Sequence, residues 1–178
     1  MTTDMVRLIE PLIPALRRYA RALLRDRTAA DDLVQDCLER AISRWHQRRA
    51  DGDARPWIFA ILHNLAMTQL GRMANRPRHV SIEATDESLL SIAASQEDRL
   101  RYRDLLAALA QLPEEQRTVL LLVNVEDLSY AEAAQVLGIP IGTVMSRLSR
   151  ARERLLKTTS AASTPSISLA TTHLRRVK

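Results

Sequence analysis

The chain has 178 residues, of which 46% are hydrophobic and 26% are charged, and this composition is that of a soluble globular protein. Its net charge of +5 and its pI near 10.1 suit a nucleic-acid partner. No apolar run reaches the ~18 residues of a membrane span, and the N-terminus lacks the basic-then-apolar order of a secretion signal, so we expect a cytoplasmic protein.

Apolar residues recur at helical spacing along most of the chain, whereas the alternating pattern of a β-strand is essentially absent. We therefore predict an all-α fold. The spacing predicts N-terminal helices over residues 6–24, 29–45 and 56–70, and C-terminal helices over 100–112, 113–125, 129–137 and 141–156.

The second predicted helix has an apolar side and an acidic side. Its acidic side carries Asp32, Gln35 and Asp36, together with Glu39. These residues are interpreted either as an ordinary solvated face or as a docking surface for a basic partner helix. The apolar side, which we expect to be buried, consists of Leu33, Val34, Cys37, Leu38, Ala41, Ile42 and Trp45.

Cysteine and histidine give no sign of a metal site. Cys37 is the only cysteine, so it cannot form an internal disulfide, and its apolar surroundings predict an inert buried thiol. The histidines show no ligand spacing with Cys37 or with one another, and we expect no metal and no cofactor. These histidines are His46, His63, His79 and His173.

A basic loop precedes the third predicted helix. Arg48, Arg49 and Arg55 flank an Asp-Gly turn signal. Trp57 and Phe59 follow directly. They are interpreted either as residues that stack on the bases of single-stranded DNA or as core residues, and the core role is favoured for Trp57. Asn64 follows on the same helix. Its amide can make bidentate contacts with a base, although a single asparagine is a weak signal.

The chain then changes character before the C-terminal helices. Residues 81–98 contain five acidic residues and no basic one. A loop this long inside one compact domain is uncommon, so we predict two small helical domains, at 1–75 and 97–157, joined by an acidic flexible linker at 76–96. Residues 158–178 are rich in Ser, Thr and Ala and are predicted to be a disordered tail.

A helix-turn-helix is specified by local signals near the C-terminal end. Ser129 and Glu132 have the spacing of a capping box that opens a helix, and Gly138 supplies the left-handed turn that closes it. Pro140 suits the first turn of the next helix. Both boundaries of the first helix of the pair are therefore predicted from the sequence.

The second helix of the pair has one apolar face and one polar, basic face. Val144, Leu148, Ala151 and Leu155 share a stripe. The opposite side is either the solvated face of a bundle helix or a surface that reads the major groove of DNA, and the neighbouring capping signals favour DNA. This side carries Thr143, Ser146, Arg147, Arg150 and Arg154.

Three stretches together resemble the extracytoplasmic-function group of bacterial sigma-70-type sigma factors. They read ADDLVQDCLERAI, RPWIFAILHNLA, and LAQLPEEQRTVLLLVNVEDLSYAEAAQVLGIPIGTVMSRLSRARERLL, and they cover most of residues 6–157. The resemblance implies that residues 1–75 are like the sigma-2 domain and residues 97–157 like the sigma-4 domain. Such proteins bind core RNA polymerase, direct it to promoters and assist DNA melting.

The resemblance also implies roles for individual residues. Asp32, Gln35 and Asp36 would dock on the beta-prime clamp helices of core polymerase, and the beta flap would be a second polymerase contact. Arg48, Arg49, Arg55 and Asn64 would bind the minus-ten element, where the loop captures an extruded base. The minus-thirty-five element would face Met145, Ser146, Arg147, Ser149 and Arg150, and from the helix face we add Thr143 and Arg154.

The sequence departs from the family pattern at two positions, Met145 and Thr68. Many members carry Lys or Arg where this chain has Met145, and many have Asp where it has Thr68, so the promoter sequence cannot be copied from a relative. A monomer held inactive by an anti-sigma factor is the expected resting form. Residues for catalysis are not recognisable, so an enzyme is not expected. The competing interpretations are a simple helix-turn-helix regulator and a sigma-like decoy that binds an anti-sigma protein without touching promoters.

Overall fold

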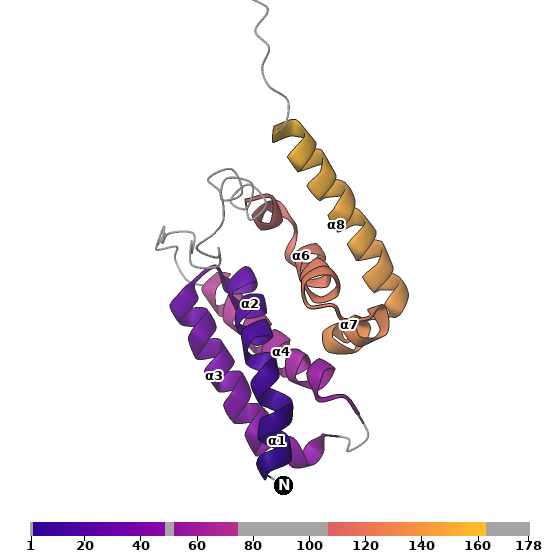
Figure 1. Ribbon diagram of the computed structural model, residues 1–178. Helices are drawn as coiled ribbons and strands as arrows, with labels where there is room; N and C mark the ends of the chain where they lie inside the picture. Colours follow the sequence, from indigo (N-terminus) through magenta and orange to yellow (C-terminus); the bar gives the residue numbers. More distant parts are fainter. Residues whose placement is uncertain (1, 49–51, 75–106, 163–178) are drawn as a thin grey trace, which may run out of the picture.

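A computed structural model describes residues 2–48, 52–74 and 107–162 (Figure 1). Every regular element in these ranges is helical, which confirms the all-α prediction. The N-terminal elements are α1 (Thr2–Ile9), η1 (Glu10–Leu12), α2 (Ile13–Leu24), α3 (Arg27–Ser43), η2 (Trp45–Gln47) and α4 (Ala54–Ala74). The C-terminal elements are a helical segment at 107–111, α6 (Glu114–Leu120), the π-helical turn η4 (Leu121–Val125), α7 (Tyr130–Leu137) and α8 (Ile141–Ala162).

The first predicted helix is interrupted, so its predicted continuity over 6–24 is wrong. The short 3₁₀ turn η1 separates α1 from α2. Pro11 lies in this turn and Pro14 lies in the first turn of α2. Proline has no N–H to donate and its ring clashes with the preceding turn, so it is tolerated where a helix starts but not inside one. Two prolines so close together therefore divide the helix.

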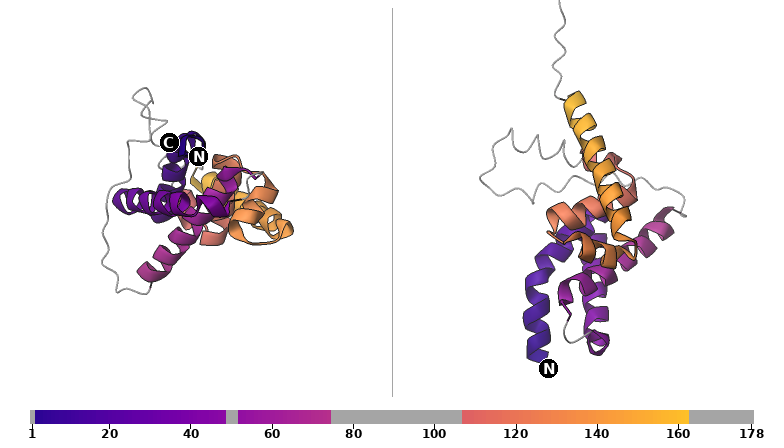
Figure 2. Two further views of the ribbon diagram at one scale, coloured as in Figure 1. Left: turned by 90° about the horizontal axis from the view of Figure 1, so that it is seen from below. Right: turned by 90° about the vertical axis from the view of Figure 1, so that its right-hand side faces the viewer.

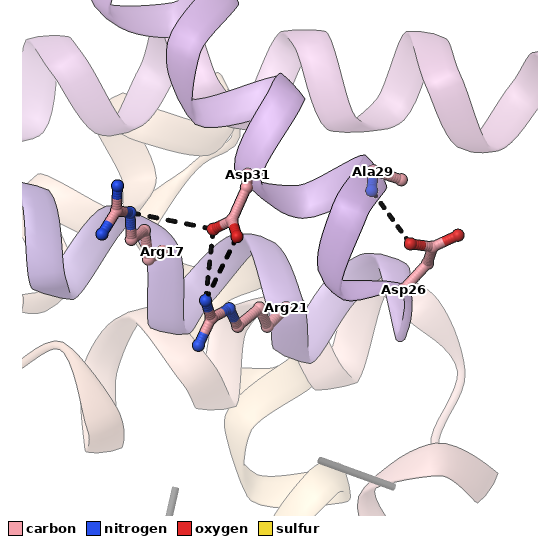
Figure 3. A network of polar contacts seen from close by, with 5 residues as sticks. All are labelled: Arg17, Arg21, Asp26, Ala29 and Asp31. Atoms are coloured by element: carbon pink, nitrogen blue, oxygen red, sulfur yellow. Dashed lines mark hydrogen bonds and ion pairs between the residues drawn. The ribbon is translucent and has the colours of Figure 1, made fainter. Parts of the chain in front are cut away.

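The start of α3 is fixed by Asp26, which the sequence analysis did not identify. The Asp26 carboxylate accepts a hydrogen bond from the backbone N–H of Ala29 at 2.9 Å (Figure 3). This N-cap satisfies one of the free donors in the first turn, so α3 begins at Arg27, two residues earlier than predicted. Arg25, with φ of 57°, ends α2 in the left-handed conformation, and only Arg25 and Asp26 lie between the two helices.

The N-terminal helices pack around a core of large apolar side chains. Helix α2 packs against α3 and α4, and α3 packs against α4. Tyr19 and Phe59 meet edge to face in this core, with ring centroids 5.6 Å apart. Most of the predicted apolar side of α3 is buried or half-buried, but Ile42 is 52% exposed, so its predicted burial is wrong. Ile42 lies in the last turn of α3.

The C-terminal helices form the predicted helix-turn-helix. Ser129 and Glu132 make both hydrogen bonds of the capping box, and Gly138 has the left-handed φ of 64° that ends α7. Helices α6 and α7 both pack against α8. The apolar stripe of α8 is confirmed at Val144, Leu148 and Ala151, which are buried, and Leu155 is half-buried. Helix α8 is therefore packed along one side, by α6 and α7.

The two groups of helices lie against each other. Helix α4 packs against α7, and the turn η4 contacts α2 (Figures 1 and 2). The buried side chains of both groups form one continuous hydrophobic cluster. The predicted disordered tail at 158–178 is wrong for its first five residues, because α8 continues to Ala162. The rest of that tail and the predicted linker at 76–96 lie outside the described residues, so these parts remain predictions.

Candidate nucleic-acid interface

Helix α3 carries several acidic side chains, of which one forms ion pairs with arginines of α2. The carboxylate of Asp31 lies between two arginines of α2, with Nη2 of Arg21 at 3.2 Å and Nε of Arg17 at 3.7 Å (Figure 3). Asp31 therefore ties α3 to α2. Asp32 and Asp36 take no part in this contact and are exposed. The charge left for a partner is thus concentrated on the outer side of α3.

The middle of this face is further ordered by a short contact within the helix. Gln35 is exposed, and its Nε2 donates to Oε1 of Glu39 at 3.1 Å. Behind it, Cys37 is fully buried, and its Sγ lies 3.7 Å from the carbonyl oxygen of Ile58. Burial raises the pKa of the Cys37 thiol to about 12, so the thiol stays protonated at neutral pH. The prediction of an inert buried thiol is confirmed.

A second polar cluster lies where α3 ends and α4 begins. The guanidinium of Arg48 lies 4.8 Å from the ring centroid of Trp45 and donates to the carbonyl of Gly52. Trp45 in turn meets Trp57 edge to face at 5.9 Å. The loop is therefore built on a stacked cation and two indoles. Arg49 lies outside the described residues.

The aromatic side chains of this region divide between core and edge. Phe59 is fully buried in the N-terminal core, so its interpretation as a base-stacking residue is wrong. Trp57 is half-buried and packs against the core, which agrees with the favoured core role. Asn64 is exposed on α4, and its backbone carbonyl accepts a hydrogen bond from the Thr68 hydroxyl at 2.8 Å. The Asn64 amide is left on the surface.

Arg55 is directed toward the C-terminal helices instead of toward solvent. It is half-buried, and its Nη2 donates to the backbone carbonyl of Glu126. Its guanidinium carbon lies 6.0 Å from the ring centroid of Phe59. The backbone N–H of Arg55 donates to the Asp53 carboxylate at 2.9 Å, which caps the start of α4. The basic residues of the predicted minus-ten set therefore have different surroundings.

The polar side of α8 is mostly open. Met145 is 51% exposed, and Ser146, Ser149, Arg150 and Arg154 are also exposed, whereas Thr143 is half-buried. Within this row, the Ser146 hydroxyl donates to the carbonyl of Thr143 at 3.1 Å, which is a contact inside the helix. The row lies along the side of α8 opposite its packing stripe, as the helical period predicted.

Arg147 differs from its neighbours on the same side. Its Nη2 lies 2.8 Å from Oε2 of Glu115 in the first turn of α6, and its side chain is 25% exposed. The ion pair joins two helices of the helix-turn-helix. Arg152 makes a similar link from another side of α8, donating to Oδ1 of Asn124 at 3.0 Å. The exposed arginines of the row are therefore Arg150 and Arg154.

The residue pair that the sequence did not reveal is Arg18 and Glu126. Nε and Nη2 of Arg18 donate to the two carboxylate oxygens of Glu126 at 2.9 and 2.7 Å, and the Glu126 side chain has no exposed surface. The hydrogen bonds to Glu126 raise the pKa of Arg18. Glu126 follows an apolar run in the sequence, and nothing in that pattern indicates a long-range partner.

Neither a metal cluster nor a membrane-spanning helix is present in the described parts of the chain. No group of three or more His, Cys, Asp or Glu residues there is arranged to hold a metal ion. No helix among the described residues is long and apolar enough to cross a bilayer.

Comparison with known proteins supports both halves of this arrangement. Residues 9–63 match the family model described as the sigma2 domain of PhyR, and residues 102–155 match sigma-70, region 4. The ECF RNA polymerase sigma factor EcfG of Rhodopseudomonas palustris (strain TIE-1) is 36% identical over 146 residues, which are 80% of this chain and 78% of that protein. SigC of Mycobacterium tuberculosis (strain CDC 1551 / Oshkosh), also described as an ECF RNA polymerase sigma factor, is 37% identical over 138 residues, with 76% and 72% covered.

Two similar solved structures are complexes. The sigma factor RpoE in complex with the anti-sigma factor NepR, from Bartonella quintana, has 32% sequence identity and a TM-score of 0.73, and the match covers 88% of this chain and 97% of that one. CnrH in complex with the cytosolic domain of CnrY has 27% identity and a TM-score of 0.70, with 92% of each chain covered.

Proposed function

This chain belongs to the extracytoplasmic-function (ECF) family of RNA polymerase sigma factors, and we propose that it directs core RNA polymerase to specific promoters and assists DNA melting when transcription starts. The observation that carries the proposal is the pairing of two surfaces in one chain. An open polar and basic face on α8 is held by a capped helix-turn-helix, and an unpaired acidic face lies on α3. Synthesis of RNA itself belongs to the polymerase, and this chain acts as its specificity subunit.

Asp32, Gln35 and Asp36 are proposed to dock on the beta-prime clamp helices of the polymerase. The support is electrostatic. Asp31 is already satisfied by Arg17 and Arg21, whereas Asp32 and Asp36 are exposed and free to meet a basic helix. Exposed charges at a protein–protein interface set the orientation and rate of association more than the affinity. The beta flap is the proposed second polymerase contact, made by the C-terminal helices.

The minus-thirty-five element is proposed to lie against α8. Side chains on the outer face of a recognition helix reach base edges in the major groove, and arginine pairs well with guanine. Arg150 and Arg154 are exposed and suited to this role, and Arg147 would reach DNA only after leaving Glu115. The full proposed set is Thr143, Met145, Ser146, Arg147, Ser149, Arg150 and Arg154.

The minus-ten element is proposed to bind at the loop between α3 and α4. Arg48 lies over Trp45, and Trp45 meets Trp57 edge to face, so a base extruded from the stack would meet a preformed aromatic and cationic surface. Asn64 offers an exposed amide about two turns further along α4. Arg49 and Arg55 complete the proposed set.

We further propose that an anti-sigma factor holds this chain inactive in the resting cell, as a cytoplasmic monomer. The similar RpoE was solved with an anti-sigma factor, and this chain shares its overall arrangement. In this proposal, residues 1–75 act as the sigma-2-like domain and residues 97–157 as the sigma-4-like domain. Residues 76–96 act as the connecting linker and residues 158–178 as a tail.

A second candidate follows from the N-terminal match to the sigma2 domain of PhyR. PhyR of Bartonella quintana is described as an anti-anti-sigma factor. A decoy of this type would bind an anti-sigma protein without reading promoters. The exposed Arg150 and Arg154 on α8 favour the promoter-reading role.

Selection of DNA by the reconstituted complex tests the proposal. The chain is mixed with a bacterial core polymerase and sheared genomic DNA, and the bound fragments are sequenced. A sigma factor should enrich fragments that share a pair of motifs at fixed spacing. Fragments identical to those retained by core polymerase alone would contradict the proposal, and they would favour the decoy if the chain still bound an anti-sigma protein.

A further inference from the structure

A bidentate ion pair centred on Glu126 joins the two groups of helices. This residue follows η4 in the C-terminal group, and its side chain is completely buried. Arg18 of α2 binds both of its carboxylate oxygens, at 2.9 and 2.7 Å. Two parallel hydrogen bonds to one carboxylate are the strong form of an arginine pair. The contact joins residues 108 positions apart in the chain.

Two other arginines of the N-terminal group bind backbone carbonyls of the C-terminal group. Arg55 donates to the carbonyl of Glu126 itself, and Arg25 donates to the carbonyl of Ala110 at 2.7 Å. Donors on one group of helices thus meet acceptors on the other at both places. Glu126 is the only one of these acceptors that contributes its side chain and its backbone together.

The Glu126 carboxylate depends on the closed arrangement. Among the described residues, its side-chain hydrogen bonds come from Arg18 alone, and Arg18 belongs to the other group of helices. A buried carboxylate without its partner is strongly unfavourable. When the two groups separate, Glu126 loses this partner and must be hydrated, and Arg18 and Arg55 are released together.

This inference rests on the proposed function, which requires the two groups of helices to bind DNA elements that lie far apart. The closed arrangement, in which the two groups pack against each other, does not allow this. The minus-ten and minus-thirty-five elements lie about 25 base pairs apart, which at about 3.4 Å per base pair is roughly 85 Å of duplex. In the structure α4, which carries Arg55 and Asn64, packs directly against α7 of the helix-turn-helix. Residues 75–106 have a covalent reach of about 100 Å, so the chain length permits separation.

We propose that Glu126 is an autoinhibitory latch that competes with promoter DNA for Arg55. In the closed form, Glu126 holds Arg18 through its carboxylate and Arg55 through its carbonyl. In the open form, Arg55 is available to the phosphates or bases of the minus-ten strand while α8 reaches the minus-thirty-five duplex at the same time. The affinity for promoter DNA is then reduced by the fraction of molecules that are closed.

Fluorescence energy transfer within the isolated chain measures closure directly. Dyes are attached to cysteines placed at the exposed positions Ser43 and Glu153, in a Cys37→Ala background. Arg18→Met removes the partner of a buried carboxylate, and we expect about a tenfold rise in the open fraction, with lower transfer efficiency. Arg7→Met removes the same charge at an exposed position of α1 and should leave the transfer efficiency unchanged.

A double variant separates opening from misfolding. Arg18→Met combined with Glu126→Met replaces the ion pair by two apolar side chains of similar length, and such replacements keep or increase stability. We expect the double variant to return to the high transfer efficiency of the parent. Failure of Arg18→Met to lower the efficiency would overturn the latch, and so would a double variant that stays as open as the single one.

A second readout uses a single-stranded oligonucleotide of random sequence as the probe. Binding of this probe by the isolated chain should tighten about tenfold in Arg18→Met, because Arg55 is released. These measurements need neither polymerase nor promoter. If Arg18→Met lowers the transfer efficiency but the chain selects no promoters, the proposed function is contradicted and the latch stands. If the chain selects promoters but Arg18→Met leaves the transfer efficiency unchanged, only the latch is contradicted.

Discussion

Arg147 of α8 and Glu115 of α6 form an ion pair across the helix-turn-helix, with Nη2 and Oε2 2.8 Å apart. The pair uses a basic side chain from the row proposed to read DNA. The glutamate is well exposed, so the pair contributes only modestly to stability. Its larger effect is on charge, because it places a carboxylate beside the proposed DNA surface.

Glu115→Gln is therefore expected to strengthen binding to duplex DNA. The substitution removes a negative charge and releases Arg147, so we expect the affinity to rise about two- to fivefold and the dependence on salt to steepen. Fluorescence anisotropy with promoter duplex over a range of salt concentrations measures both quantities. Glu10→Gln on the exposed turn η1 is the matched control. A Glu115→Gln affinity equal to that of the control would remove Arg147 from the proposed DNA set.

Arg150→Ala is expected to weaken binding to one class of promoter by about 1–3 kcal/mol, because Arg150 is exposed on the outer face of α8. Polymerase association should not change. Arg7→Ala, which removes an exposed arginine of α1, controls for the loss of net charge. The division of labour between the two surfaces would be refuted by an equal loss of polymerase binding in Arg150→Ala.

Reversal of charge on α3 should have the opposite selectivity. Asp36→Lys is expected to weaken association with core polymerase at least about tenfold, and Asp32→Lys combined with Asp36→Lys should abolish it. Binding of duplex DNA by the isolated chain should persist. Glu10→Lys changes an exposed acid by the same charge and should behave like the parent in gel filtration with core polymerase. Normal assembly of the double variant would disprove the docking assignment.

Two glycine-to-alanine substitutions in the helix-turn-helix are expected to change stability in opposite directions. Gly138 has a φ of 64°, which an alanine adopts only with strain, so Gly138→Ala should lower the free energy of unfolding by about 1 kcal/mol. Gly142 lies in α8 with open space around it, and Gly142→Ala should raise the free energy of unfolding by up to about 1 kcal/mol. Urea unfolding compares them. Two substitutions with the same sign would show that the backbone conformation of Gly138 is not the controlling factor.

The helix-turn-helix was predictable because its signals are local. The capping box at Ser129 and the left-handed Gly138 act over a few residues, and both are confirmed. The face of α8 followed from the helical period. The contacts that the sequence did not predict are Asp31 with Arg21, which joins α3 to α2, and Glu126 with Arg18, which joins the residue after η4 to α2. Their formation depends on how the helices pack, and no spacing along the chain indicates it.

A buried histidine predicts how stability responds to acid. His63 lies in the N-terminal core with its Nδ1 3.2 Å from the Tyr19 hydroxyl, and burial lowers its pKa from 6.5 to about 4. Between these values the unfolded chain binds a proton that the folded chain does not. The free energy of unfolding is therefore not reduced by His63 above pH 6.5. As the pH falls from 6.5 toward 4, proton uptake by the unfolded chain lowers the free energy of unfolding by up to about 3 kcal/mol.

Thermal unfolding at a series of pH values tests this linkage. His63→Phe should lower the dependence of the melting temperature on pH between 6.5 and 4, whatever its effect on stability at neutral pH. His46→Gln, which changes an exposed histidine, should keep the slope of the parent. An identical slope in the parent and in His63→Phe would assign the acid sensitivity to other groups.

Run-off transcription is the most direct test of the central claim, that two helical surfaces in one chain turn a polymerase into a promoter-selective enzyme. The purified chain is added to bacterial core polymerase and genomic promoter fragments, alongside the Arg150→Ala variant and the Asp32→Lys, Asp36→Lys variant. We predict transcripts with defined start sites for the parent, loss of one promoter class for the first variant, and no specific transcripts for the second. Absence of start-site selection by the parent with any bacterial core polymerase would contradict the account.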